Sequence, residues 1–337
     1  MWKGWQSVLW TSMIALSLAA CGGNSSGANS ADSNYPDKPI TIVVPSGAGG
    51  GIDMAARSLA KVADQQKLVS QPIMVENKPG GGQVVGTVEF ANKEARNDYK
   101  LLLTSTPFVL NYVKKEGNSP VSFRDLAPLA RLQTDYGVLA VKPDSKYKDL
   151  QSLFDAMKAD PNQVVVAGGS SPGSFDHLNV ILPATAAGVD AQAIKYIAYD
   201  GGGEAVTALL GGSADVLSSD VSGIMEFVKA GKARVLGVSS GERLPDELKD
   251  FPTYKEQGVD AVLTNWRGIF GPKEMSADAK AFWQEKLKAL AETEEWKTEL
   301  KLQGVQDGYM AAEEFAKTLE ADETMYKEIY TNLGMAK

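Results

Sequence analysis

The sequence contains very little of the chemistry on which most metalloenzymes and many hydrolases depend, with one cysteine and one histidine among 337 residues. A single cysteine excludes a disulfide framework and any zinc or iron–sulfur site built from several cysteines. A single histidine excludes a metal site built from a cluster of histidines. We therefore expect no bound metal and no cofactor.

Positive charge is also scarce. The chain has 34 Lys and Arg residues against 42 Asp and Glu residues, a net charge of −8 with His neutral. No run of four or more basic residues occurs. These two features argue against a nucleic-acid partner.

A long apolar run is missing as well. Lys3 precedes an apolar run over residues 8–20, which is shorter than the roughly 20 residues that a membrane-spanning helix needs. This pattern predicts a signal peptide over residues 1–20. The segment Leu18-Ala19-Ala20-Cys21 resembles the bacterial lipobox, so we expect a lipoprotein signal peptide.

Lipidation at Cys21 would place acyl chains in the membrane and the protein on its extracytoplasmic face. Residues 21–34 are rich in Gly, Ser and Asn and are predicted to form a flexible tether. Cleavage by an ordinary signal peptidase, without lipidation, stays open as an alternative.

From Tyr35 onward, short β-branched runs alternate with segments of helical periodicity, which indicates an α/β protein. Helices are expected over 53–65 and 84–95, and residues 277–333 are expected to be helical with almost no strand. The expected strands are 40–44, 73–76, 101–104, 164–167, 194–198, 216–217 and 235–238.

Two extended passages, 136–141 and 262–270, are interpreted as crossings between two domains. The first domain would comprise residues 35–139 plus 268–337, and the second residues 140–267. A cleft between two such domains is the usual place for a small ligand.

Two glycine-rich loops each follow a strand and open a helix. Such a loop turns backbone N–H groups toward an anion, and the helix start adds partial positive charge. We expect the loops to face each other across the cleft and to share a carboxylate. Asp53 is expected to cap the first helix. The candidate residues are Ser46, Gly47, Ala48, Gly49, Gly50 and Asp53 in the first loop, and Tyr199, Gly201, Gly202, Gly203 and Glu204 in the second.

A dinucleotide site is an alternative for the first loop. The fingerprint G-x-G-x-x-G fails because its sixth place, counted from Gly47, is Ile52. Glu76 nevertheless lies where a ribose ligand is expected, so this alternative stays open.

Hydroxyl groups are expected to line the rest of the cleft. The candidates are Thr104, Ser105 and Thr106, then Ser170, Ser171 and Ser174, together with His177 and Asp220.

Residues 169–173 match G-x-S-x-G, the nucleophile elbow of esterases, with Ser171 as the nucleophile. The motif does not fit the esterase mechanism, because the residue after the nucleophile should donate its backbone N–H to the oxyanion and Pro172 has no N–H. His177 follows too closely to act as the distant base, and we interpret it as a packing or hydrogen-bonding residue. A secreted, lipid-anchored serine hydrolase remains the alternative function.

The order of motifs along the chain resembles the Bug/TctC family, the extracytoplasmic solute receptors of tripartite tricarboxylate transporters. The matching segments are residues 35–40, 45–57, 75–82, 173–178, 209–215, 229–232 and 251–258.

The resemblance implies a two-domain periplasmic-binding-protein fold of type II, a Venus flytrap, with two interdomain crossings and C-terminal helices. It implies a receptor and not an enzyme, which closes on a small carboxylate held by backbone N–H groups of the two loops. The expected partners are the membrane permease subunits of such a transporter, and the receptor is expected to be a monomer.

Two departures bear on the ligand. Ser46 stands where many members have an aromatic residue, and Glu204 stands where many have proline. The segment 201–205 is similar to the tricarboxylate-receptor branch, which favours a citrate-like di- or tricarboxylate. Asp200 and Glu204 would repel an anion, so they either point away, accept hydrogen bonds from ligand hydroxyls or bind a cation beside the ligand.

Overall fold

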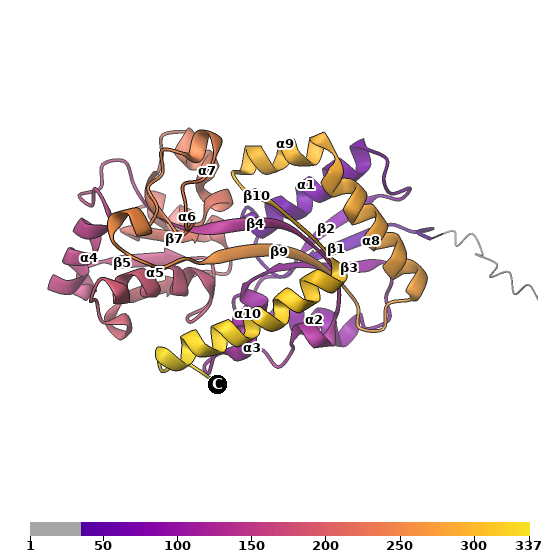
Figure 1. The fold of residues 1–337 in the computed structure, drawn as a ribbon, viewed down its shortest axis with the longest axis horizontal. Helices are drawn as coiled ribbons and strands as arrows, with labels where there is room; N and C mark the ends of the chain where they lie inside the picture. The colour runs from indigo at the N-terminus through magenta and orange to yellow at the C-terminus, as the bar shows by residue number, and fades with distance from the viewer. Residues whose placement is uncertain (1–34) are drawn as a thin grey trace, which may run out of the picture. The chain divides into compact units, whose positions relative to one another are not determined.

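The computed structural model describes residues 35–337, which form one compact unit (Figure 1). The predicted signal peptide, Cys21 and the tether lie outside the described residues. Within residues 35–337, no helix combines the length and the apolar character needed to cross a bilayer.

The first sheet is built around three parallel strands in the order β2 (Ile73–Asn77), β1 (Ile40–Val44) and β3 (Lys100–Ser105). The β1 sequence is rich in β-branched residues and almost fully buried, as expected of a central parallel strand. Strand β9 (Thr264–Gly271) lies antiparallel between β3 and β4 (Ala127–Val141). Strand β10 (Gln306–Ala311) pairs with β4.

The second sheet shares β4 with the first. The last part of β4 pairs antiparallel with β7 (Val216–Asp220) and β8 (Arg234–Val238). Strand β5 (Val165–Gly168) lies between β7 and the edge strand β6 (Lys195–Ala198), parallel to both. Strand β4 therefore joins the two sheets (Figure 1).

Helices pack on both sheets. Those near the first sheet are α1 (Gly51–Gln65), α2 (Val84–Lys93), α3 (Pro107–Val113), α8 (Ala277–Glu292) and α9 (Glu294–Gln303). Those near the second are α4 (Leu150–Ala159), α5 (Phe175–Ala186), α6 (Gly202–Leu210) and α7 (Val221–Lys229).

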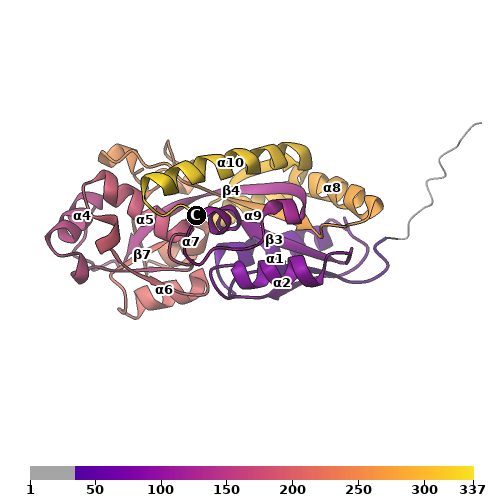
Figure 2. The same ribbon diagram turned by 90° about the horizontal axis from the view of Figure 1, so that it is seen from below.

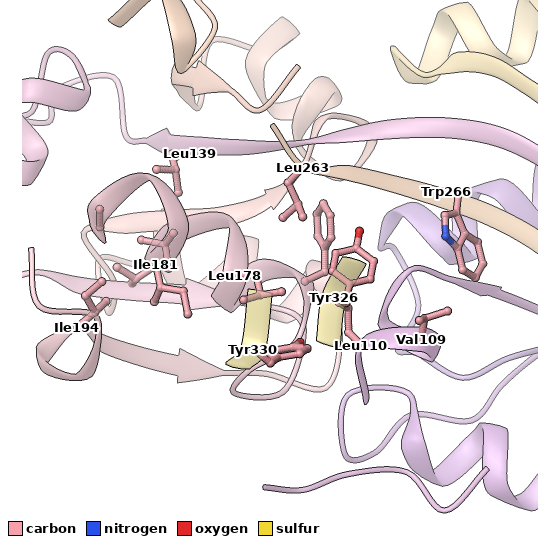
Figure 3. Packing of buried hydrophobic residues seen from close by; sticks show 14 of the residues in the cluster. Val109, Leu110, Leu139, Leu178, Ile181, Ile194, Leu263, Trp266, Tyr326 and Tyr330 are labelled. Carbon is pink, nitrogen blue, oxygen red and sulfur yellow. The ribbon is translucent and has the colours of Figure 1, made fainter. Parts of the chain in front are cut away.

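The last helix, α10 (Ala312–Asn332), runs alongside both groups (Figure 2). Its buried tyrosines, Tyr326 and Tyr330, lie between Leu110 of α3 and Leu178 of α5 in one apolar cluster (Figure 3). The Tyr330 hydroxyl also donates to the carbonyl of Gly173. The C-terminal helix thus ties the β5–α5 loop to the first sheet's helices.

The structure agrees with most of the predicted elements to within two or three residues at each end. The passages interpreted as crossings fall in β4 and β9. The placement of the domain boundaries at 139/140 and 267/268 stays a prediction.

The C-terminal stretch needs a correction, because β10 interrupts the segment that was expected to be helical. Its sequence, QDGYMA, has only a weak strand pattern. Pairing with β4 supplies the stabilisation that its local propensity lacks. Gly304, in the left-handed conformation, ends α9 just before it.

Candidate functional site

A cavity lies where the loops after β1, β5 and β7 meet the start of α6. It encloses about 400 Å³, including the solvent at its mouth. Its lining is polar and contains no Lys, Arg or His among the described residues. The lining residues are Ser46, Gly50, Gly51, Ile52, Gln83, Ser105, Pro107, Gly169, Ser170, Phe175, Asp176, Gly202, Ser219, Asp220 and Asn265.

Four helices of nine or more residues begin at this cavity. Residues of the N-cap or first turn of α1, α5, α6 and α7 all belong to the lining. The first N–H groups of a helix have no partner within the helix, and the start of a helix carries partial positive charge. The cavity is therefore suited to a small anion even without basic side chains.

The two glycine loops contact each other directly. The Gly47 N–H donates to the carbonyl of Asp200 at 3.1 Å. A Cβ on Gly201 would lie 3.1 Å from Gly47, and a Cβ on Gly203 would lie 2.9 Å from the Ala48 carbonyl oxygen. Glycine is needed at these positions because two backbones approach closely, and not because the chain turns there.

Asp53 supports the first loop from behind. Its carboxylate accepts hydrogen bonds from the Gly49 N–H (3.0 Å), Arg57 Nε (2.9 Å) and Asn77 Nδ2 (2.9 Å). Burial alone would raise the pKa of Asp53, but these donors together lower it. The expectation that Asp53 is the N-cap is wrong, because the N-cap is Gly50 and Asp53 lies in the first turn.

Six of the residues predicted from the sequence line the cavity: Ser46, Gly50, Ser105, Ser170, Gly202 and Asp220. Gly47, Ala48, Gly49, Gly201 and Gly203 form the loop contact around it. The side chain of Thr104 donates to Gln83 Oε1, and that of Thr106 donates to the carbonyl of Thr264. Both are fully buried behind the lining.

The acidic residues of the second loop lie outside the lining. Glu204 is exposed and its carboxylate faces the N–H of Asp200 at 3.4 Å. Tyr199 donates its N–H to Gly168 and lies outside the lining too. Of the three possibilities raised for Asp200 and Glu204, the geometry therefore favours the one in which they point away from the ligand.

Ser171 and His177 do not form a catalytic pair. The Ser171 hydroxyl accepts from Lys114 Nζ at 2.7 Å. His177 Nδ1 accepts from the Gly173 N–H at 2.8 Å, and its ring packs on Tyr196. Burial and, second, the charge of Lys114 lower the pKa of His177 to about 4, so the imidazole is neutral.

Ser174, the N-cap of α5, is completely buried and its hydroxyl has no partner among the described residues. Glu76, the residue suggested as a ribose ligand, lies within 3.4 Å of both Lys78 and Lys100. These positions give Glu76 a surface ion-pair role on β2.

An ion network behind the cavity was not foreseen from the sequence. Arg267 on β9 is buried, and its Nη2 contacts Asp220 Oδ2 (2.6 Å), Asp135 Oδ2 (3.1 Å) and Ser222 Oγ (3.1 Å). Burial raises the pKa of Asp135, and the neighbouring guanidinium offsets only part of that rise. A side chain added at Gly51 would overlap Arg267, so the network also fixes the start of α1.

Nine lining residues were not predicted from the sequence, and four of these have polar side chains: Gln83, Asp176, Ser219 and Asn265. Gln83 sits in the left-handed conformation at the start of α2 and donates to Ser105 Oγ. Asp176 comes shortly after Ser170, Ser171 and Ser174, in the first turn of α5. This position next to predicted lining residues could have identified it from the sequence. Asn265 lies next to Trp266, within the passage interpreted as a crossing.

A family model described as "Tripartite tricarboxylate transporter family receptor" matches residues 55–335. A protein of Cupriavidus necator, the UPF0065 protein in the gbd 5′ region, is 31% identical over 307 residues, covering 90% of each chain.

Solved structures agree on the fold. The periplasmic binding protein BugD is 23% identical, with a TM-score of 0.81 over 90% of this chain and 100% of that one. MatC from Rhodopseudomonas palustris, solved with bound malate, is 22% identical, with a TM-score of 0.80 over 88% and 99% of the two chains. The chain therefore has the fold of periplasmic binding proteins.

Proposed function

The chain belongs to the tripartite tricarboxylate transporter receptor family, and from this premise we propose that it captures a small carboxylate outside the cytoplasm and delivers it to the membrane subunits of a tripartite transporter. Members of this family are solute-binding receptors and not enzymes.

One observation carries the proposal: four helix N-termini converge on a cavity without basic side chains. The carboxylate is neutralised by backbone N–H groups and helix dipoles. Hydroxyls of Ser46, Ser105 and Ser170 supply further hydrogen bonds. The malate-bound relative MatC, which shares the fold, gives independent support for a carboxylate ligand.

Capture takes place by closure of two lobes, residues 35–139 with 268–337 and residues 140–267, on the ligand. The backbone contact between the glycine loops supports this, because the loops come from the two different lobes. The lobes stay connected through β4 and through the segment that leads into β9.

The receptor is anchored by lipid at Cys21 and reaches its permease on the tether of residues 21–34. It acts as a monomer, since each chain carries a complete cavity of its own. The lipobox supports the anchor.

The sequence of the second glycine loop favours a citrate-like acid. The lining favours a ligand with fewer negative charges than citrate, because it already holds the carboxyl groups of Asp176 and Asp220. We therefore rank mono- and dicarboxylates above tricarboxylates.

The hydrolase alternative is not retained. The Ser171 hydroxyl is bound to Lys114, and the His177 Nδ1 accepts from a backbone N–H instead of reaching Ser171. No backbone donor is available from Pro172 for an oxyanion.

A thermal-shift screen of mono-, di- and tricarboxylates tests the proposal. An acid present at a hundredfold excess over its Kd stabilises the folded protein by about 2.7 kcal/mol, which raises the melting temperature by several degrees. The corresponding uncharged amides are the matched controls, and they should give no shift because the site neutralises a negative charge. If no acid of the panel raised the melting temperature, or if the amides did so equally, the carboxylate proposal would be abandoned.

A further inference from the structure

Asp176 is a buried carboxyl group at the wall of the cavity. It is the second residue of α5, its exposed fraction is 8%, and it belongs to the lining. One carboxyl oxygen accepts the Gly169 N–H at 2.7 Å. Within residues 35–337, no Lys, Arg or His forms an ion pair with it. A buried carboxylate without a cationic partner is costly to the protein alone.

Asp220, on the same wall, is in the opposite situation. It contacts Arg267 at 2.6 Å and accepts from Asn265 Nδ2 at 3.2 Å and from the Gly223 N–H at 2.9 Å. Arg267 also forms an ion pair with Asp135. The buried guanidinium of Arg267 is therefore shared between two carboxylates, and a negative charge on Asp176 has no cationic partner within residues 35–337.

Asn265 provides a second, independent sign that the cavity needs a donor. Its Nδ2 donates to Asp220, which fixes the orientation of the side-chain amide. Its Oδ1 is buried and has no hydrogen-bond partner among the described residues. A buried acceptor of this kind is normally paired.

We propose that Asp176 selects ligands that carry an ammonium group as well as a carboxylate, so that the solute is an amino acid. The carboxylate lies at the helix N-termini, and the ammonium group is bound by Asp176 and Asn265 Oδ1. An ammonium group suits this corner because it supplies three donors and one positive charge. This inference rests on the proposed function and adds to it the chemistry of the ligand.

Proton release gives an independent signature of the contact. Burial and, second, the charge of Asp220 raise the pKa of the free Asp176 carboxyl group to about 8. The Gly169 N–H, the Ser170 hydroxyl and Arg267 oppose it. Two further titratable groups lie nearby. The hydroxyl of Tyr196 on β6 donates to the Ser170 carbonyl, and His177 on α5 is neutral.

The ammonium group stabilises the charged form of Asp176, so binding near neutral pH releases a proton. The affinity for an amino acid should then increase between pH 6 and pH 8, approaching about tenfold per pH unit when a full proton is released.

The experiment compares matched ligands by isothermal titration calorimetry: L-glutamate with glutarate, L-aspartate with succinate, and L-alanine with propionate. In the wild-type protein, we expect the amino member of at least one pair to bind at least tenfold more tightly. Asp176→Asn keeps the shape and the acceptor for Gly169 but loses the charge, so it should abolish that preference and its pH dependence. Glu226→Gln removes an exposed charge on α7 away from the lining and should change neither.

The melting temperature of the unliganded variant provides a further readout. A carboxyl group whose folded-state pKa is raised costs stability as the pH rises from about 4 toward 8, so at pH 7 the Asn variant should melt at a higher temperature than wild type. A purely structural role for Asp176 predicts the reverse.

The inference is overturned if the acid without an amino group binds as tightly as its amino partner in every pair, if L-malate binds more tightly than L-aspartate, or if Asp176→Asn keeps the preference. In each of those outcomes the carboxylate receptor itself still stands. The absence of binding by every acid, with or without an amino group, would instead contradict the proposed function.

Discussion

Lys114, at the end of α3, is a buried amine that bridges two parts of the chain. Its Nζ donates to Ser171 Oγ (2.7 Å) and to the Pro172 carbonyl (3.0 Å), both in the loop after β5. No carboxylate pairs with it among the described residues, and burial lowers its pKa to about 8. The protein therefore holds a positive charge in a position where water would solvate it better.

Replacing Lys114 by Met should change how stability depends on pH. In wild type the lysine binds its proton more tightly when unfolded than when folded, so the free energy of unfolding should rise between pH 8 and pH 10, by up to about 2 kcal/mol. Urea unfolding at several pH values should show that this rise is absent in Lys114→Met. The neighbouring exposed residue supplies the control, Lys115→Met, which should keep the wild-type slope. Equal slopes for all three proteins would show that Lys114 is not desolvated.

At the scale of the elements, the site depends on how closely two strand–loop–helix units approach each other. The first turn of α6 lies against the β1–α1 loop, backbone to backbone, with no side chain between them. Only a residue without a Cβ allows this contact at Gly203. The backbone conformation of Gly203 is not the reason, because it is one that any residue can adopt.

The change Gly203→Ala should therefore weaken carboxylate binding by about tenfold or more while leaving the fold intact. The added methyl group would lie 2.9 Å from the Ala48 carbonyl oxygen and would hold the two loops apart. Gly241→Ala makes the same chemical change at an exposed site where the new carbon meets only Val262 at 3.8 Å, so it should bind normally. Ligand titration with the acid that gives the largest thermal shift tests the pair, and equal affinities would mean that loop contact is not required for binding.

The glycine loops show what sequence reasoning can and cannot predict here. A strand, a glycine run and a helix start are local features, so both strand–loop–helix units could be predicted. The extended passages that fall in β4 and β9 could be predicted for the same reason. Strand β10 could not, because its pairing with β4 is a long-range effect that overrides its weak propensity. The lack of a cationic partner for Asp176 could not be predicted either, since it depends on the pairing of the buried Arg267 with Asp135 and Asp220.

At the scale of the whole molecule, the proposed anchor decides where the receptor works. Cys21→Ser removes the thiol that forms the thioether, so the precursor should remain unprocessed or lose its acyl chains. Detergent partition of the wild-type and variant proteins, with labelled palmitate as the tracer, measures this. Ser25→Ala, in the same tether, should partition like wild type. Equal labelling of Cys21→Ser and wild type would rule out lipidation at this residue.

The order in which the strands are synthesised has a consequence for export. Strand β9 fills the gap between β3 and β4, yet Thr264, where it begins, follows Thr106 by 158 residues. Until the ribosome has added Gly271, β3 has no neighbour on that side and the first sheet stays open. Pairings of such long range form slowly, so we expect the nascent chain to stay unfolded until β9 has been synthesised. We expect this slow closure of the first sheet to favour export, because a chain that is still unfolded can pass through a translocation channel.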